Sequence, residues 1–198
     1  MIIHQIFLKV SDKNLEDFPI FVDGIKIWKK WCLDNGYEYK LWTEIPYELL
    51  DDYDKDMLKD CMDRFTFSAI DFIRMPILQK YGGMYVDLDV YPTDKLINIM
   101  DRETIFGTGY NDKKSFITNN VMKCSKENAL KMKMYSRKFY EEKKQIKIYD
   151  TWVRRFFLRT VGASMVCNFC KEVLKYEKMP LDEFKECFVD FTTGTWSL

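Results

Sequence analysis

Apolar residues follow two periods along the chain, and these periods predict alternating strands and helices. Residues 2–7 are a short apolar run typical of a buried strand. A helix is predicted to begin at Asp17-Phe18-Pro19, because Asp caps helices and Pro is tolerated in the first turn. It should end near Asn35-Gly36, a common helix-ending pair. Residues 37–42 alternate like a second strand, so this β-α-β start predicts a parallel α/β sheet.

The middle of the chain predicts a long helix that leads into a strand. Residues 44–62 are acidic and are expected to form short surface helices. Apolar residues recur at helical spacing over 67–81, and Gly82-Gly83 ends that pattern. Pro76 lies inside this helix, which predicts a kink or a restart just after Arg74. Residues 84–86 then form a strand that runs into Asp87-Leu88-Asp89.

The last part of the chain continues the same alternation. Strands are predicted over 104–110, 116–123 and 188–191, and helices over 126–143 and within 150–176, with a terminal loop over 192–196. No repeat, low-complexity linker or second domain is visible. The prediction is one α/β domain over residues 1–198.

Composition narrows the classes of function. The formal net charge is zero, whereas a general nucleic-acid binder is usually basic, so no nucleic-acid partner is expected. No apolar run reaches the roughly 18 residues of a membrane span, and no signal peptide is visible. The Lys-rich helix over 126–144 favours a solvated face over peripheral contact with an anionic membrane, which stays an alternative.

The cysteines and the single histidine carry weak signals. Six cysteines without an export signal predict free thiols in a reducing cytoplasm. Cys167 and Cys170 form a C-x-x-C, but a zinc site needs two further ligands, so packing in a helix is favoured over zinc. His4 is interpreted as a buried core residue rather than a catalytic base. Trp28 and Trp31 are likewise expected in the core.

Asp87-Leu88-Asp89 is the first candidate for chemistry. On a strand, two carboxylates at i and i+2 point to the same face, and the carboxyl end of such a strand borders the usual ligand crevice of an α/β sheet. Carboxylates suit Mn²⁺ or Mg²⁺. A D-x-D alone is a weak signal, and a solvated turn is the alternative. The apolar strand and the double glycine before it strengthen the functional interpretation.

Asp71 and Arg74 form the second candidate pair. They are three residues apart on a predicted helix and therefore share a face. The Arg74 guanidinium fits a phosphate or sugar hydroxyls, and Asp71 could accept hydrogen bonds from a sugar. An internal salt bridge is the alternative, and spacing alone favours it. The apolar neighbours Phe72 and Ile73 argue against a purely solvated surface.

Together these residues resemble a family signature. Ser68-Ala69-Ile70-Asp71-Phe72-Ile73-Arg74, with Tyr81-Gly82-Gly83-Met84-Tyr85-Val86-Asp87-Leu88-Asp89, is similar to the sugar-binding DXD region of glycosyltransferase family 32. That family includes fungal initiating α-mannosyltransferases and transferases of capsular polysaccharide biosynthesis, and more distantly the clostridial glucosylating toxins. The first strand, the second strand and the final Thr195-Trp196 resemble the family more weakly.

The resemblance implies a fold and an activity. The fold would be GT-A, a Rossmann-like, mostly parallel sheet flanked by helices. The enzyme would transfer a sugar, with retention, from a UDP- or GDP-sugar to a glycan, a lipid-linked saccharide or a protein. It would act in the cytoplasm of a bacterium or a virus-infected host cell. A haloacid-dehalogenase-type phosphatase and a non-catalytic nucleotide-sugar or carbohydrate-binding module are the alternatives.

The resemblance also implies roles for individual residues. Asp89 would be the main Mn²⁺ or Mg²⁺ ligand, with Asp87 contacting the metal through water and the ribose. Asp71 and Arg74 would hold the donor sugar. The other implied donor contacts are Phe7 (stacking on the base), Tyr85, Asn119, Asn120, Thr195 and Trp196. Phe7 stands where the family has Trp, and the family's His-bearing C-terminal metal loop is missing. The last protein ligand of the metal is therefore left open.

Overall fold

The computed structural model describes residues 1–9, 12–64, 68–111, 114–144 and 162–191. Within them, five strands form the main sheet: β1 (Ile2–Ile6), β2 (Glu38–Trp42), β3 (Met84–Val86), β5 (Ile105–Asn111) and β6 (Lys114–Lys123). A smaller sheet pairs β4 (Val90–Pro92) with β7 (Phe188–Asp190). The α-helices are α1 (Pro19–Asp34), α2 (Asp52–Arg64), α3 (Ser68–Tyr81), α4 (Lys126–Lys143), α6 (Ala163–Phe169) and α7 (Leu181–Cys187). Short 3-10 turns are η1 (Leu15–Asp17), η2 (Tyr47–Leu49) and η3 (Asp94–Ile99), and η4 (Cys170–Leu174) is a π turn.

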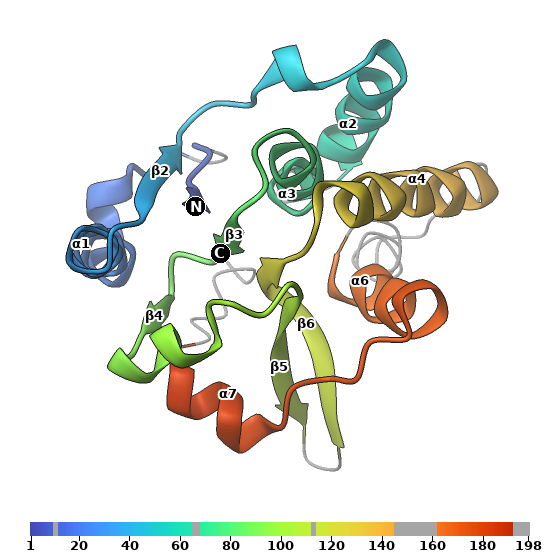
Figure 1. Cartoon of the computed structure of the whole chain (residues 1–198). Helices are drawn as coiled ribbons and strands as arrows, with labels where there is room; N and C mark the ends of the chain where they lie inside the picture. The colour runs from blue at the N-terminus through green and yellow to red at the C-terminus, as the bar shows by residue number, and fades with distance from the viewer. Residues whose placement is uncertain (10–11, 65–67, 112–113, 145–161, 192–198) are drawn as a thin grey trace.

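The main sheet has the strand order β2-β1-β3-β6-β5. β2, β1 and β3 run parallel, as the β-α-β start predicts, whereas β6 and β5 are antiparallel additions. Figure 1 shows α1, β4 and α7 on one side of this sheet and α2, α3, α4 and α6 on the other. The fold is therefore of the α/β class, with one sheet between helices on both faces. The parallel strands β2, β1 and β3 form the half of the sheet that leads into Asp87-Leu88-Asp89.

Two apolar clusters fill the two faces, and strand alternation divides residues between them. Tyr85 of β3 packs in the cluster under α3 and α4, whereas its neighbours Met84 and Val86 pack in the cluster under α1. Trp28 and Trp31 are buried in this second cluster, which confirms their prediction as core residues. The core thus holds β3 rigidly from both sides just before the D-x-D sequence begins.

Several local predictions need correction. α1 is capped by Phe18 without a side-chain bond, while Asp17 belongs to the preceding turn η1. Residues 52–64 form one helix with a buried face rather than short surface helices. α3 runs unbroken through the buried Pro76, so the predicted restart after Arg74 is wrong, while the alternative of a kink there stays a prediction. In each case tertiary packing outweighs a local signal. In the predicted helical region 150–176, residues 150–161 lie outside the described part of the chain.

Gly82 and Gly83 connect α3 to β3 in a way that other residues could not. Their φ angles are 69° and 86°, in the left-handed region that glycine tolerates. A Cβ on Gly83 would lie 2.1 Å from the Ile2 carbonyl oxygen. The double glycine therefore ends the helix and lets β3 start flush against β1.

His4 lies beneath this connection as a neutral, fully buried residue. Its Nε2–H donates to the Gly82 carbonyl oxygen at 3.0 Å, and its Nδ1 accepts from the Trp42 indole at 3.3 Å, so neither nitrogen can take a second role. Burial lowers the pKa of His4 to about 4, against the raising effect of the Gly82 hydrogen bond, and the charge of Lys40 lowers it further. His4 is a structural residue, as the sequence favours.

We expect acid to destabilise the protein through His4. Its pKa is about 4 in the fold and 6.5 in the reference state, so the unfolded chain takes up the proton first as the pH falls. Neutral His4 therefore contributes about 3 kcal/mol to the free energy of unfolding above pH 6.5. This contribution is lost as the pH falls to about 4. Urea unfolding of the wild type and of His4→Gln over this range should show a steeper pH slope for the wild type. Equal pH slopes for the two proteins would contradict this role of His4.

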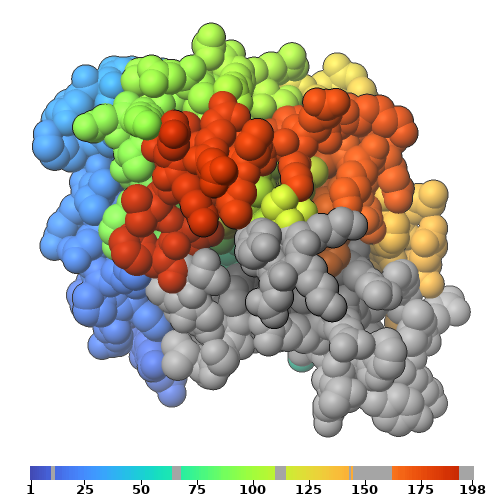
Figure 2. Space-filling view, turned by 90° about the horizontal axis from the view of Figure 1, so that it is seen from below, coloured from blue at the N-terminus to red at the C-terminus, as the bar shows by residue number. Residues whose placement is uncertain are grey.

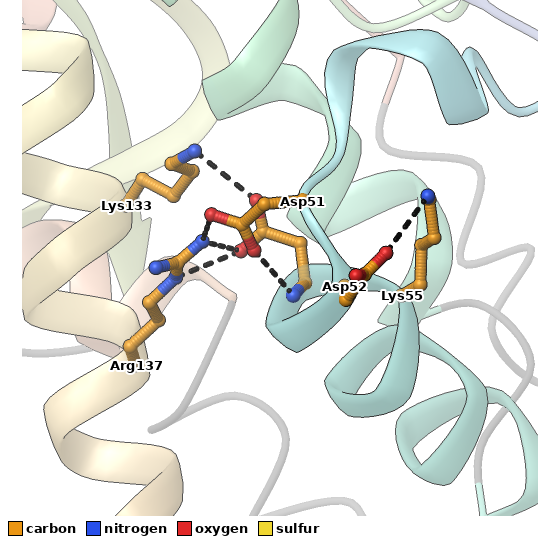
Figure 3. A network of polar contacts seen from close by, with 6 residues as sticks. Asp51, Asp52, Lys55, Lys133 and Arg137 are labelled. Atoms are coloured by element: carbon orange, nitrogen blue, oxygen red, sulfur yellow. Dashed lines mark hydrogen bonds and ion pairs between the residues drawn. The ribbon is translucent and has the colours of Figure 1, made fainter.

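A buried ion network joins α2 to α4. The Asp54 carboxylate is fully buried and accepts from Lys133 Nζ at 3.1 Å and from Arg137 Nε at 2.8 Å. Arg137 also reaches Asp51, whose side chain caps the start of α2 by accepting from the Asp54 N–H at 2.9 Å. Figure 3 shows Lys133 and Arg137 extending from one helix toward this turn. The network fixes α2 against the helix layer that also carries α3.

Asp54→Ala should destabilise the fold by about 3–5 kcal/mol, because it leaves two cations at a buried interface without their shared carboxylate. Asp52→Ala is the matched control: its carboxylate is solvent-exposed on the same turn and pairs with Lys55 alone among the contacts drawn in Figure 3. Thermal unfolding should show a large loss for the first variant and little change for the second. Similar melting temperatures would contradict the role of Asp54.

Some of the surface lysines on and next to the basic helix α4 pair with acids of the same helix. Lys131 pairs with Glu127 and Lys144 with Glu141 along its surface. Such i,i+3 and i,i+4 pairs are typical of a solvated helix face. Among the described residues, no helix combines the length and apolar character that crossing a bilayer requires.

Candidate active site

The D-x-D sequence lies in a turn rather than on a strand. β3 ends at Val86, and the Val90 N–H donates to the Asp87 carbonyl oxygen at 3.2 Å, which closes a four-residue turn before β4. This turn (Asp87–Val90) is called the DXD turn below. The expectation of two carboxylates on one strand face is therefore wrong. The reason is that β4 leaves the main sheet to pair with β7.

Arg74 lies at the centre of the polar cluster beside the DXD turn. It is 1% exposed, and its guanidinium lies 3.0 Å from Asp71 Oδ1 and 3.0 Å from Asp87 Oδ1. Its Cζ lies 4.4 Å from the centre of the Tyr85 ring, and the Tyr85 hydroxyl donates to Asp87 Oδ1 at 2.5 Å. Four of the residues that the sequence singles out, Asp71, Arg74, Tyr85 and Asp87, thus form one cluster around the Arg74 guanidinium.

Asn119 and Asn120 join this cluster through a bulge in β6. The β5–β6 register jumps from Phe106↔Met122 to Gly107↔Thr118, so residues 119–121 have no partner on β5 in that ladder. Asn119 turns toward α3, where its amide donates to Asp71 Oδ1 at 2.7 Å and its carbonyl accepts from Arg74 at 2.8 Å. Asn120 donates instead to Asp190 of β7 at 2.7 Å. Bulges of this kind often re-aim side chains beside active sites.

The electrostatics of the cluster favour a bound cation. Burial raises the pKa of Asp87 to about 7; the Arg74 charge opposes this rise and the Asp89 charge adds to it. Burial also raises the pKa of Asp71, against Arg74 and the Asn119 hydrogen bond. Burial alone would lower the pKa of Arg74, but Asp87, Tyr85 and Asp71 together raise it. Within this crowded acidic group, further positive charge would stabilise the ionised carboxylates.

The donor set around the DXD turn suits a hard divalent ion. Asp87 and Asp89 supply carboxylate oxygens, the ligands that Mn²⁺ and Mg²⁺ prefer. In the described part of the chain, no group of three or more His, Cys, Asp or Glu side chains could hold a metal by itself. Such ions commonly take one or two protein carboxylates and complete their shell with substrate phosphates and water. The residues therefore fit a metal that binds together with a diphosphate.

Of the remaining predicted residues, Phe7 is the one that lies in the described part of the chain. Phe7 follows the end of β1, is partly exposed, and packs edge-on against Phe18 at 6.3 Å between ring centres. Thr195 and Trp196 lie outside the described residues. The chain before them, β7, runs beside the DXD turn, where the Phe191 N–H donates to the Asp89 carbonyl oxygen at 3.0 Å. Figure 2 shows the same neighbourhood on the surface, with the red C-terminal segment against the green residues that follow the turn.

A family of known proteins matches the stretch of chain that carries this cluster. The family described as glycosyltransferase sugar-binding region containing DXD motif matches residues 21–106, a stretch that contains Asp71, Arg74, Asp87 and Asp89. This chain is a glycosyltransferase. The predicted glycosyltransferase class is therefore confirmed, and the phosphatase alternative is not. The family in general implies a divalent metal ion and a nucleotide-sugar donor.

One solved structure supports a GT-A fold for the chain. The PaToxG glycosyltransferase aligns with 87% of this chain and 69% of its own, with a TM-score of 0.56 and 11% identity, which supports the fold alone. A glycosyltransferase involved in glycosylation of the major capsid of PBCV-1 aligns with 87% of this chain and 75% of its own, at 12% identity and a TM-score of only 0.39. No curated protein sequence matches the chain.

Two contacts of the site were missed by sequence reasoning. Gln5 donates from β1 to the Asp87 carbonyl oxygen at 3.1 Å, and Asp190 accepts from Asn120. For Gln5 a signal existed, since it is a polar residue inside an otherwise apolar strand. For Asp190 there was none, because its neighbours become visible only when β7 pairs with β4.

Proposed function

We propose that this glycosyltransferase moves a sugar from a nucleoside diphosphate donor to an acceptor hydroxyl with the help of Mn²⁺ or Mg²⁺. The observation that carries the proposal is the direct contact of Arg74 with both Asp71 and Asp87 beside the DXD turn. Asp89, with Asp87, would hold the ion. When bound, the ion would offset the negative charge that grows on the departing diphosphate.

The Arg74 cluster would orient the donor sugar. Arg74 is almost fully buried, so in this proposal it contacts the two carboxylates and not the sugar. The Asp71 and Asp87 side chains are 8% and 23% exposed and form the outer edge of the cluster. In our proposal the two carboxylates accept hydrogen bonds from the sugar and ribose hydroxyls. The Arg74 charge favours their ionised forms against the effect of burial and fixes their direction, and Asn119 holds Asp71 in place.

The nucleotide would lie along the carboxyl ends of the parallel strands. Phe7, at the end of β1, would stack on the base. Tyr85 is fully buried and bonded to Asp87, so its contribution would be to hold that carboxylate at the floor of the nucleotide site. Asn120, Thr195 and Trp196 would close over the diphosphate from the C-terminal side.

We propose a retaining outcome. His4 cannot act as a catalytic base, since both of its ring nitrogens are engaged in hydrogen bonds inside the core. With no histidine base, the leaving diphosphate itself would accept the proton of the acceptor hydroxyl. An NMR assignment of the product anomer tests this, and an inverted product would overturn it.

The acceptor and the cellular location complete the proposal. A glycan, a lipid-linked saccharide or a protein is the acceptor class, in line with polysaccharide biosynthesis. All six cysteines are free thiols in the structure, which supports the reducing cytoplasm as the compartment. The paired charges of α4 support a solvated helix over contact with a membrane.

A panel of UDP-, GDP- and dTDP-sugars tests the function directly. With Mn²⁺, one donor should release its nucleotide slowly even without acceptor, and the same donor should raise the melting temperature. EDTA should abolish release, and Mn²⁺ or Mg²⁺ should restore it. No release and no thermal shift with any donor would overturn the proposal.

A further inference from the structure

The backbone of the DXD turn is held by donors from outside it. The Asp87 carbonyl oxygen accepts from Gln5 Nε2 at 3.1 Å, in addition to the Val90 N–H that closes the turn. The Val90 carbonyl oxygen accepts from the Trp28 indole at 2.7 Å. The Asp89 carbonyl oxygen accepts from the Phe191 N–H. Side chains of β1 and α1 and the end of β7 thus fix a segment that leaves the main sheet.

Gln5 is built to hold one orientation. It is fully buried, and its Oε1 accepts from the Tyr39 hydroxyl at 2.8 Å. Because the oxygen of the amide is occupied by a donor, the Nε2 group must point at the Asp87 carbonyl. A chain of hydrogen bonds therefore crosses from β2 through β1 to the first residue of the DXD turn.

One face of α1 supports the other side of the turn. Ile20, Gly24 and Trp28 are spaced by four residues and share this face. A Cβ on Gly24 would lie 2.2 Å from the Leu88 carbonyl oxygen, so the helix backbone packs directly on the middle of the turn. The Tyr91 hydroxyl donates to the Ile20 carbonyl oxygen at 2.5 Å and ties the start of β4 to the same face.

We infer that Gln5 and Trp28 are positioning residues for the metal-binding carboxylates, with Gly24 providing the clearance they need. The inference rests on the proposed function, in which Asp87 and Asp89 hold the ion. Backbone bonds to Asn120 and Phe191 hold Asp87 and Asp89 at the edges of the turn, and divalent ions demand narrow ligand geometry, so the remaining bonds to the turn should matter for metal binding. Outer-shell hydrogen bonds that orient ligands typically change metal affinity about 10- to 100-fold when removed.

Trp28→Phe and Trp31→Phe make a matched pair for the test. Both tryptophans are buried on α1, and their ring centres lie 5.6 Å apart. Trp31 stacks on Tyr37, whereas the Trp28 indole donates to the Val90 carbonyl oxygen of the turn. Binding of Mn²⁺ is measured with and without saturating UDP and GDP, from the electron paramagnetic resonance signal of the free ion. Mn²⁺ activation is measured in parallel with the donor that the panel selects. Thermal unfolding reports the loss of packing in each variant.

We expect the half-saturating Mn²⁺ concentration to rise about 10- to 100-fold in Trp28→Phe and to change little in Trp31→Phe. Gln5→Met, which keeps the side-chain length but removes both hydrogen bonds, should behave like Trp28→Phe. Tyr39→Phe should cause a smaller rise, since Gln5 keeps its bond to Asp87. The thermal losses of the two tryptophan variants should be similar.

The outcomes separate this inference from the proposed function. Equal Mn²⁺ affinities in the two tryptophan variants, with a metal-dependent wild type, would overturn the inference alone. Normal Mn²⁺ binding that weakens in Trp28→Phe, without turnover of any nucleotide sugar, would overturn the proposed function alone. A wild type that binds no Mn²⁺ and works without metal would overturn both.

Discussion

Replacing Asp89 with alanine is expected to lower the rate of nucleotide release by about 10³-fold. A metal ion contributes several kcal/mol to a departing diphosphate, and each 1.36 kcal/mol corresponds to a factor of ten in rate. Asp89 lies at the third position of the DXD turn, where its carboxylate is the main proposed ligand. Its loss should raise the Mn²⁺ requirement and lower the maximal rate together. Single-turnover assays across Mn²⁺ concentrations measure both.

Asp94→Ala is the control for this prediction. Asp94 is an exposed acid five residues further on, in the first turn of η3. Its removal makes the same change of charge close to the site and should leave the rate within about twofold, as is usual for surface positions away from the chemistry. An Asp89→Ala enzyme with wild-type rate and metal requirement would show that the DXD turn holds no catalytic ion.

Arg74→Met should destabilise the folded protein by about 3–5 kcal/mol and abolish activity. The substitution keeps most of the side-chain volume but leaves Asp71 and Asp87 without the cation that both contact at 3.0 Å. The melting temperature should fall by about 10 °C for a chain of this size. Differential scanning calorimetry measures the loss. Arg74→Lys should recover part of the stability but little activity, because an ammonium cannot bridge both carboxylates as the guanidinium does.

Arg102→Met gives the same chemical change at a solvated ion pair. Arg102 contacts Glu183 at the surface, with side chains that are 43% and 32% exposed. Surface pairs contribute little, so its melting temperature should stay close to that of the wild type. If both variants melted alike, the Arg74 cluster would not be the buried charge centre that the structure shows.

Local pattern was sufficient for most of the elements. The parallel pair β1 and β2, the helices α1 and α4 and the strand β7 lie close to their predicted residues. Predictions failed where burial depends on distant partners. α2 looks like an acidic surface segment, yet Asp54 is fully buried because Lys133 and Arg137 arrive from α4, about 80 residues away.

For the candidate site, the residues were visible in the sequence but their arrangement was not. Asp71, Arg74, Asp87 and Asp89 stood out by residue type and spacing, and a resemblance to known enzymes grouped them. Gln5 was missed although it is a polar residue within a mostly apolar strand, and Asp190 was missed because its partners meet it only when β7 pairs with β4.

The sequence by itself determined the α/β alternation, the double-glycine connection and the identity of the acidic residues, because hydrophobic period and glycine conformation act over a few residues. Only the tertiary structure decided that Asp87–Val90 is a turn, that a bulge in β6 turns Asn119 toward Asp71, and that Arg74 is buried between two carboxylates. These features depend on which strands pair and which helix faces meet. Those choices are made by packing between segments that are far apart in the chain, so the pattern within any one segment does not contain them.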